Sequence, residues 1–95
     1  MKKLTKKILV KFLEDLTGEK NGASGAFKLM SGKEGKQYSE YSCGKWWVNI
    51  EESYLYDVCQ GTYGWAAQAK LIDFLAEYGY YYENGYSWDM AIMEG

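Results

Sequence analysis

The sequence predicts a single α+β domain in which helices pack on one side of an antiparallel sheet. Three observations lead to this prediction. Two segments repeat apolar residues at helical spacing, the segment between them alternates with a period of two, and an Asn-Gly pair lies near the C-terminus between alternating flanks. A chain of 95 residues can bury one core and is short for two, so residues 1–95 are treated as one domain.

The first predicted helix spans residues 2–17. Its apolar side chains recur every fourth residue, as in an amphipathic helix, at Leu4, Ile8, Phe12 and Leu16. Gly18 follows the last of them and is a natural left-handed C-cap. The opposite side of this helix is basic and carries Lys2, Lys3, Lys6, Lys7 and Lys11.

Residues 26–52 are predicted to form a three-stranded antiparallel meander. Phe27 and Leu29 alternate with polar or flexible neighbours, residues 32–35 supply a turn, and residues 36–42 form the second strand. The third strand contains Trp46 and Trp47, whose side chains must point to opposite faces of the sheet. The segment 53–60 fits either a helical turn or a continued strand.

A second helix is predicted over residues 64–79, with Gly79 as its C-cap. By apolar spacing, its predicted core face carries Trp65, Ala69, Ile72, Leu75 and Ala76. Asp73 and Glu77 then project outward.

Residues 80–93 are predicted to form a C-terminal β-hairpin. Asn84-Gly85 is typical of a type I′ turn, which would give Gly85 a positive φ. Alternation places Tyr80 and Tyr82 on the face opposite to Tyr81, so one of these two sets is expected to meet solvent.

The composition excludes most enzyme classes. The chain has no histidine and no arginine, so the usual general base, the usual metal ligand and the usual phosphate-binding fork are missing. Cys43 and Cys59 are predicted to be reduced structural thiols, because the sequence shows no secretory signal. Without histidine, the two cysteines cannot close a four-ligand zinc site unless carboxylates join them. Carboxylate pairs such as Asp73 and Glu77 leave a small hydrolase formally open, but they are better interpreted as a solvated helix face. We expect no catalytic residue, no metal and no cofactor.

The charges are divided unequally along the chain. Residues 1–50 contain ten of the 11 lysines, whereas residues 51–95 contain eight of the 13 acidic residues and eight of the ten tyrosines. Tyrosine offers rigid contact area with a polar tip, and an acidic surface attracts a basic partner. The sequence therefore predicts a non-enzymatic inhibitor or adaptor whose partner-binding residues are Asp73, Glu77, Tyr80, Tyr82, Glu83, Tyr86 and Asp89. A solvated acidic face over an aromatic core is the competing interpretation.

A small chain with an acidic, tyrosine-rich half resembles the inhibitors that phages encode against host defence, notably the anti-CRISPR proteins. The segment 54–59 (Tyr-Leu-Tyr-Asp-Val-Cys), the alanine-rich helix after it and a terminal aromatic segment with Trp88 are similar to the end of one anti-CRISPR family that blocks a CRISPR effector nuclease. The resemblance covers less than half of the chain. It implies inhibition by protein binding, in the host cell cytoplasm, with a basic, nucleic-acid-binding site of a nuclease complex as the target.

Two other functions stay open at this point. The Lys-rich face of the first helix, formed by Lys2, Lys3, Lys6, Lys7 and Lys11, could bind nucleic acid or another anionic surface directly. An exposed tryptophan on the sheet could stack on sugar rings. No apolar run approaches the ~20 residues that cross a bilayer, and no secretory h-region follows the first lysines. We therefore expect a cytoplasmic protein with neither a membrane nor a small-molecule substrate as partner.

Overall fold

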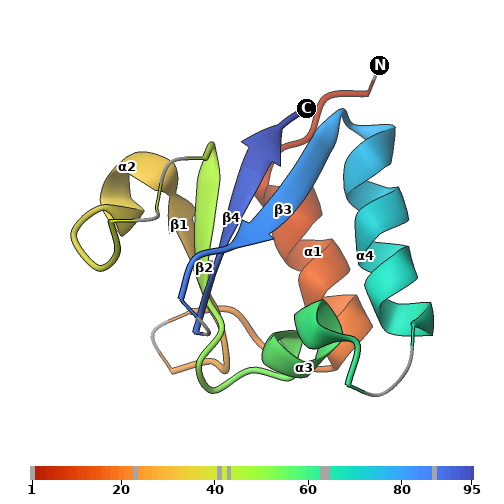
Figure 1. The fold of residues 1–95 in the computed structure, drawn as a ribbon, viewed down its shortest axis with the longest axis horizontal. Coiled ribbons are helices and arrows are strands. Elements are labelled where there is room, and N and C mark those ends of the chain that lie inside the picture. The colour runs from red at the N-terminus through yellow and green to blue at the C-terminus, as the bar shows by residue number, and fades with distance from the viewer. Residues whose placement is uncertain (1, 23, 41, 43, 63–64, 87) are drawn as a thin grey trace.

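The computed structural model describes residues 2–22, 24–40, 42, 44–62, 65–86 and 88–95. It confirms the α+β class (Figure 1). The elements in chain order are α1 (Lys6–Thr17), β1 (Lys28–Ser31), α2 (Gly32–Gly35), β2 (Trp46–Asn49), α3 (Leu55–Gln60), α4 (Ala66–Glu77), β3 (Tyr80–Asn84) and β4 (Asp89–Glu94).

The four strands form one antiparallel sheet in the order β1-β2-β4-β3. β4 therefore lies inside the sheet, and β1 and β3 are its edges. Val48 of β2 lies opposite Leu29 and Met90, and Tyr82 of β3 lies opposite Ile92. In Figure 1, α1 and α4 lie next to each other, while α2 lies at the other end of the sheet beside β1 and β2.

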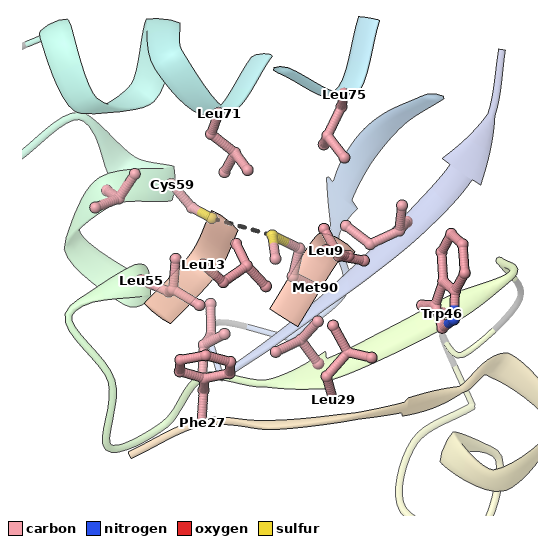
Figure 2. Close-up of a cluster of buried hydrophobic side chains, with 14 of the residues drawn as sticks. Leu9, Leu13, Phe27, Leu29, Trp46, Leu55, Cys59, Leu71, Leu75 and Met90 are labelled. Atoms are coloured by element: carbon pink, nitrogen blue, oxygen red, sulfur yellow. Dashed lines mark hydrogen bonds between the residues drawn. The ribbon is translucent and has the colours of Figure 1, made fainter. Parts of the chain in front are cut away.

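The main core lies between the sheet and the helices α1, α3 and α4 (Figure 2). Leu9 and Leu13 of α1 face Leu71 and Leu75 of α4, and the rings of Phe12 and Phe74 stack with centroids 3.8 Å apart. Such burial of aliphatic and aromatic side chains is the dominant stabilising contribution to a domain of this size. It fixes α4 against α1 on one side and against the sheet on the other.

The first helix begins four residues later than expected. Thr5 is its N-cap, and the Thr5 hydroxyl accepts a hydrogen bond from the Ile8 N–H at 3.2 Å. The helix starts after Thr5 because an N-cap residue is itself extended and its hydroxyl binds a free N–H group of the first turn. Leu4 is nevertheless buried, and Gly18 is the predicted left-handed C-cap with φ 74°.

The expected three-stranded meander is wrong. The described residues of the expected second strand, 36–40 and 42, form no strand, and β1 is followed directly by the short helix α2. Ser31 caps this helix: the Ser31 hydroxyl accepts from the Glu34 N–H at 3.1 Å, and the Glu34 side chain bonds back to the Ser31 N–H. This Ser-x-x-Glu capping box is a helix-start signal, and it outweighs the turn tendency of the two glycines.

Residues 53–60 adopt the helical alternative as α3. Glu19 holds its start, because the Ser53 hydroxyl donates to Glu19 Oε1 at 2.7 Å and the Tyr54 N–H donates to Glu19 Oε2 at 3.0 Å. A carboxylate at the N-terminus of a helix satisfies free N–H groups and complements the helix dipole.

The C-terminal hairpin of β3 and β4 is confirmed, but its turn is not of type I′. Positive φ angles occur at Gly18, Gly22, Gly61 and Gly79, whereas Gly85 has none. The Asp89 carboxylate shapes the connection instead, since Asp89 Oδ1 accepts from the Tyr86 N–H at 2.7 Å. The Asn84 side chain donates to the Asp89 carbonyl at 3.2 Å, so both polar residues serve a longer loop.

Candidate functional site

The outward side of α4 carries an apolar stripe that was expected to face the core. Leu71 and Leu75 are the buried residues of this helix, whereas Trp65 at its N-cap is 81% exposed and Ile72 is 49% exposed. Residues at spacings of three and four share one helix face, so Trp65, Ala69, Ile72 and Ala76 form a continuous stripe beside the buried face. The helix is rotated relative to the expectation because Phe74 stacks on Phe12.

The stripe borders the edge strand β3. Ile72 and Ala76 of α4 and the three tyrosines Tyr80, Tyr81 and Tyr82 line a hollow of about 370 Å³ between the helix and the strand. We call this hollow the α4–β3 groove. Tyr80 and Tyr82 are half-buried on the helix side of β3, and Tyr81, which points to the other side, is 42% exposed. The predicted opposition of these tyrosines is confirmed, and Tyr81 is the most exposed of the three.

Two contacts fix the tyrosines on the helix side. The hydroxyl of Tyr82 accepts a hydrogen bond from Gln68 Nε2 at 3.2 Å, and the same amide donates to the Cys59 carbonyl at 3.0 Å. Burial raises the pKa of the Tyr82 hydroxyl. The Tyr80 ring lies 5.6 Å from the ring of Trp46, centroid to centroid. Both side chains are therefore held in place before any partner arrives, which reduces the entropy lost on binding.

Three exposed carboxylates lie on the two elements that form the groove. Asp73 and Glu77 lie one turn apart on the outward side of α4, and Glu83 is exposed on β3. Glu77 Oε2 lies 3.8 Å from Lys2 Nζ in an exposed ion pair, which is worth little in water. Asp73, Glu77, Tyr80, Tyr82 and Glu83 are thus five of the seven predicted binding residues, and the structure gathers them around one helix and one edge strand.

The other two predicted residues belong to a different cluster. Asp89 is 1% exposed, so the expectation that it forms part of an acidic surface is wrong. Its carboxylate accepts hydrogen bonds from Trp47 Nε1 and the Ser39 hydroxyl on the sheet face that α2 covers. Tyr86 is exposed, but its ring stacks on Trp88 and its hydroxyl donates to Glu40 Oε1 at 2.8 Å. Asp89 is a structural residue, and Tyr86 lies with it at the far end of β3.

The lysines of the alternative site are all exposed on or just before α1. Lys2 pairs with Glu77, and Lys11 Nζ lies 3.0 Å from Asp15 Oδ2. Because Phe12 and Phe74 join α1 to α4, the basic helix lies beside the acidic one. The two charged halves of the sequence therefore meet along a seam between these helices, and they do not form opposite ends of the molecule.

The described residues offer little for covalent or metal chemistry. The Cys59 thiol is buried and donates to the Met90 sulfur at 3.4 Å (Figure 2), and burial raises the pKa of the thiol to about 12. A protonated, buried thiol is a poor nucleophile. Cys43 lies outside the described residues. Within the described ranges, no three Asp, Glu or Cys side chains come close enough to hold a metal ion, and no helix is long and apolar enough to span a bilayer.

The sequence predicted Trp65 and Ile72 in the core, and it left open whether Tyr81 or the pair Tyr80 and Tyr82 meets solvent. The signal was present, since α4 carries apolar residues around more of its circumference than one core contact can bury. Leu75 was predicted on the core face and is buried, and Leu71 joins it there beside the aromatic Phe74 and Tyr78, which also pack inward.

Comparisons of the chain with protein-family models, with curated proteins and with solved structures gave no match.

Proposed function

We propose that this protein acts by binding another protein, without catalysis, through a surface made of the outward stripe of α4, the α4–β3 groove and the carboxylates around it. The observation that carries the proposal is the exposure of Trp65 and Ile72 on one helix face, together with the exposed Tyr81, which lines the α4–β3 groove with Ile72. Large apolar side chains gathered on one surface mark interaction sites more often than scattered ones do.

The chemistry of this surface favours a basic partner. Trp65, Ile72 and Tyr81 supply apolar contact area of the type that dominates binding energy once water is excluded. Asp73 and Glu77 on α4 and Glu83 on the opposite face of β3 give both elements negative charge, which accelerates the encounter with a positively charged surface. The seam with α1 bounds the acidic area, so the orientation of the partner is restricted as well.

A basic surface that binds nucleic acid is the kind of target that suits these groups. Carboxylates can form ion pairs with the lysine and arginine side chains that otherwise neutralise the phosphates of the nucleic acid. The proposal in its most specific form is therefore an inhibitor of the anti-CRISPR kind, which blocks a nucleic-acid-binding site of a CRISPR effector nuclease. The resemblance of residues 54–59 and of the helix after them to such inhibitors supports this form.

The proposal is tested by affinity capture followed by binding measurements. The tagged protein is used to capture partners from the lysate of a bacterium that carries a CRISPR effector, and the retained partner is then titrated by biolayer interferometry. The test variant combines Trp65→Ala, Ile72→Ala and Tyr81→Ala. The control variant is Tyr38→Ala, an exposed aromatic residue beside α2.

Removal of a central aromatic anchor costs about 2 kcal/mol or more, so the test variant should lose about 30-fold or more in affinity. The control variant should bind like the wild type. Unchanged affinity of a folded test variant would contradict the proposal. Salt-sensitive binding of generic DNA or RNA that is lost when Lys6, Lys7 and Lys11 become glutamate would favour the nucleic-acid-binding alternative instead.

A further inference from the structure

We propose that the outer edge of β3 receives an extended, basic segment of the partner, which pairs with it antiparallel as a fifth strand of the sheet and places alternate side chains in the α4–β3 groove. This inference rests on the proposed function and specifies how the same surface recognises its partner. Strand addition to a sheet edge is a recurrent mode of peptide recognition, in which backbone hydrogen bonds give affinity and adjacent hollows give specificity.

The hydrogen bonds of the sheet show which groups of β3 face outward. Gly95 N–H donates to the Gly79 carbonyl at 2.8 Å, so Gly79, just before β3, directs its carbonyl to β4. In an antiparallel pair, every second residue directs both of its backbone groups to the same neighbour. The backbone groups of Tyr81 and Glu83, two and four residues after Gly79, therefore point to β4. On the other side of β4, Ile50 N–H donates to the Trp88 carbonyl at 2.9 Å, which agrees with this alternation.

By the same alternation, the N–H and C=O groups of Tyr80 and Tyr82 point away from β4, to the open edge. β3 is the last strand of the sheet, and no hydrogen bond within the described part of the chain engages these backbone groups. An unpaired strand edge is a template for another strand. β3 also lacks the lysine and proline residues that commonly protect such edges.

The groove supplies the second half of the site. Ile72 and Ala76 form its helical wall, and the side chains of Tyr80 and Tyr82 form the wall on β3. In an antiparallel pair, residues that exchange hydrogen bonds directly face each other and project their side chains to the same side. Each partner residue bonded to Tyr80 or Tyr82 therefore projects its own side chain toward the groove, where an apolar residue fits.

The charges select a basic segment. Glu83 projects from β3 on the side opposite to the groove, and Asp73 lies on the outward side of α4. A strand with lysines at the positions between its apolar residues would bring those lysines to the Glu83 side. A second copy of this chain is disfavoured as the occupant, because pairing two β3 edges would bring the acidic surroundings of both grooves together.

The test uses three synthetic peptides with blocked ends. The first is a seven-residue peptide of alternating lysine and valine, beginning and ending with lysine. The second has the same sequence, with the backbone amides of its three valines N-methylated. The third carries its three N-methyl groups on the backbone amides of three lysines instead. N-methylation removes a backbone donor and leaves the side chain in place, so the three peptides have the same charge.

Binding is followed on the ¹⁵N-labelled protein by NMR, with amide hydrogen exchange as a second readout. The parent peptide should slow the exchange of the Tyr80 and Tyr82 amides and leave the already bonded amides of Tyr81 and Glu83 little changed. N-methylation at valine should weaken binding about tenfold or more, because at least one hydrogen bond and the close approach of the strands are lost. N-methylation at lysine should change the affinity less than about threefold, because those groups face solvent.

Three results would overturn strand addition: equal affinities of the two N-methylated peptides, unchanged exchange at Tyr80 and Tyr82 at millimolar parent peptide, or protection of these amides in the free protein that grows with protein concentration. The third result would assign the edge to a second copy of the chain. The proposed function is tested separately by the Trp65, Ile72 and Tyr81 variants. If these variants lose the captured partner while the two N-methylated peptides bind equally, the surface binds a partner by side chains alone.

Discussion

The indole Nε1 of Trp47 donates a hydrogen bond to Asp89 Oδ2, 3.0 Å away, on the face of the sheet that α2 covers. The Ser39 hydroxyl donates to the same oxygen, and the Tyr86 N–H donates to Oδ1. One buried carboxylate therefore joins β2, β4, the segment after α2 and the loop after β3. It gives this second, smaller cluster a fixed geometry without a large apolar core.

Replacing Asp89 by alanine should lower the free energy of unfolding by about 3 kcal/mol, because buried donors on Trp47 and Ser39 would lose their acceptor. Urea denaturation followed by tryptophan fluorescence measures this change. The matched control is Asp73→Ala on the outside of α4, which should stay within about 0.5 kcal/mol of the wild type. Equal stabilities of the two variants would show that the Asp89 network contributes nothing.

Cys59 should be inert to thiol reagents in the folded protein. Burial raises its pKa from 9.0 to about 12, so almost no thiolate exists at pH 8. In a Cys43→Ser variant, Cys59 should react with iodoacetamide only when the protein unfolds, and urea should accelerate the reaction strongly. A reaction in the native state at the rate of a free cysteine would contradict the buried position.

The same pKa shift predicts a loss of stability at alkaline pH. Between pH 9 and about pH 12 the unfolded thiol loses its proton while the folded thiol retains it, so the unfolded state binds fewer protons and the free energy of unfolding falls as pH rises. The stabilising contribution is fully present below pH 9. In a Cys59→Ala variant, the free energy of unfolding, expressed relative to the value of the same protein at pH 7, should fall less steeply over this range. Parallel curves for the two proteins would contradict the assignment.

Gly18 and Gly85 should respond differently to substitution by alanine. Gly18 has φ 74°, and a Cβ there would meet no atom within 4 Å, so the cost is purely conformational. A left-handed conformation costs an alanine about 1 kcal/mol. Gly85 has no positive φ, so Gly85→Ala should be neutral or slightly stabilising. Thermal melts compare the two variants. A larger fall in melting temperature for Gly85→Ala than for Gly18→Ala would indicate a type I′ turn at Gly85.

Charge reversal should separate steering from anchoring at the proposed surface. The double variant Asp73→Lys, Glu83→Lys should slow association with the captured partner about tenfold and should flatten its salt dependence, since surface charges act mainly on the encounter rate. The control variant Glu51→Lys, Glu52→Lys changes the net charge equally in the exposed turn after β2. If both variants slow association to the same extent, only the net charge matters and the position of the acids does not.

Local patterns predicted α1, α4 and the hairpin, because each depends on neighbouring residues. The four-residue spacing of α1, its Gly18 cap and the alternation of Tyr80, Tyr81 and Tyr82 all describe how the chain turns locally. The error at α2 was also local, because the Ser31–Glu34 capping box starts a helix where a turn was expected. The error at Asp89 arose because distant residues decide its environment. Asp89 looks like a surface acid in sequence and becomes a buried acceptor because Ser39 and Trp47 reach it from other parts of the chain.

The candidate site was predicted in part for the same reason. Acidic residues and tyrosines could be placed on the same half of the chain from composition alone, and five of the predicted residues lie on α4 and β3, where Tyr80 and Tyr82 line the groove. The sequence shows that α4 carries more apolar residues than one core contact can bury, but the stacking of Phe74 on Phe12 decides which of them face inward. That packing turns Trp65 and Ile72 outward.

Hydrogen exchange with mass-spectrometric detection, on the protein alone and bound to its captured partner, tests the central claim most directly. The account predicts slower exchange in the bound state at residues 66–77 and 80–84, with residues 6–17 and 32–42 unchanged. Protection of residues 6–17 with unchanged exchange over 66–77 and 80–84 would contradict it and would assign binding to the lysine-rich helix.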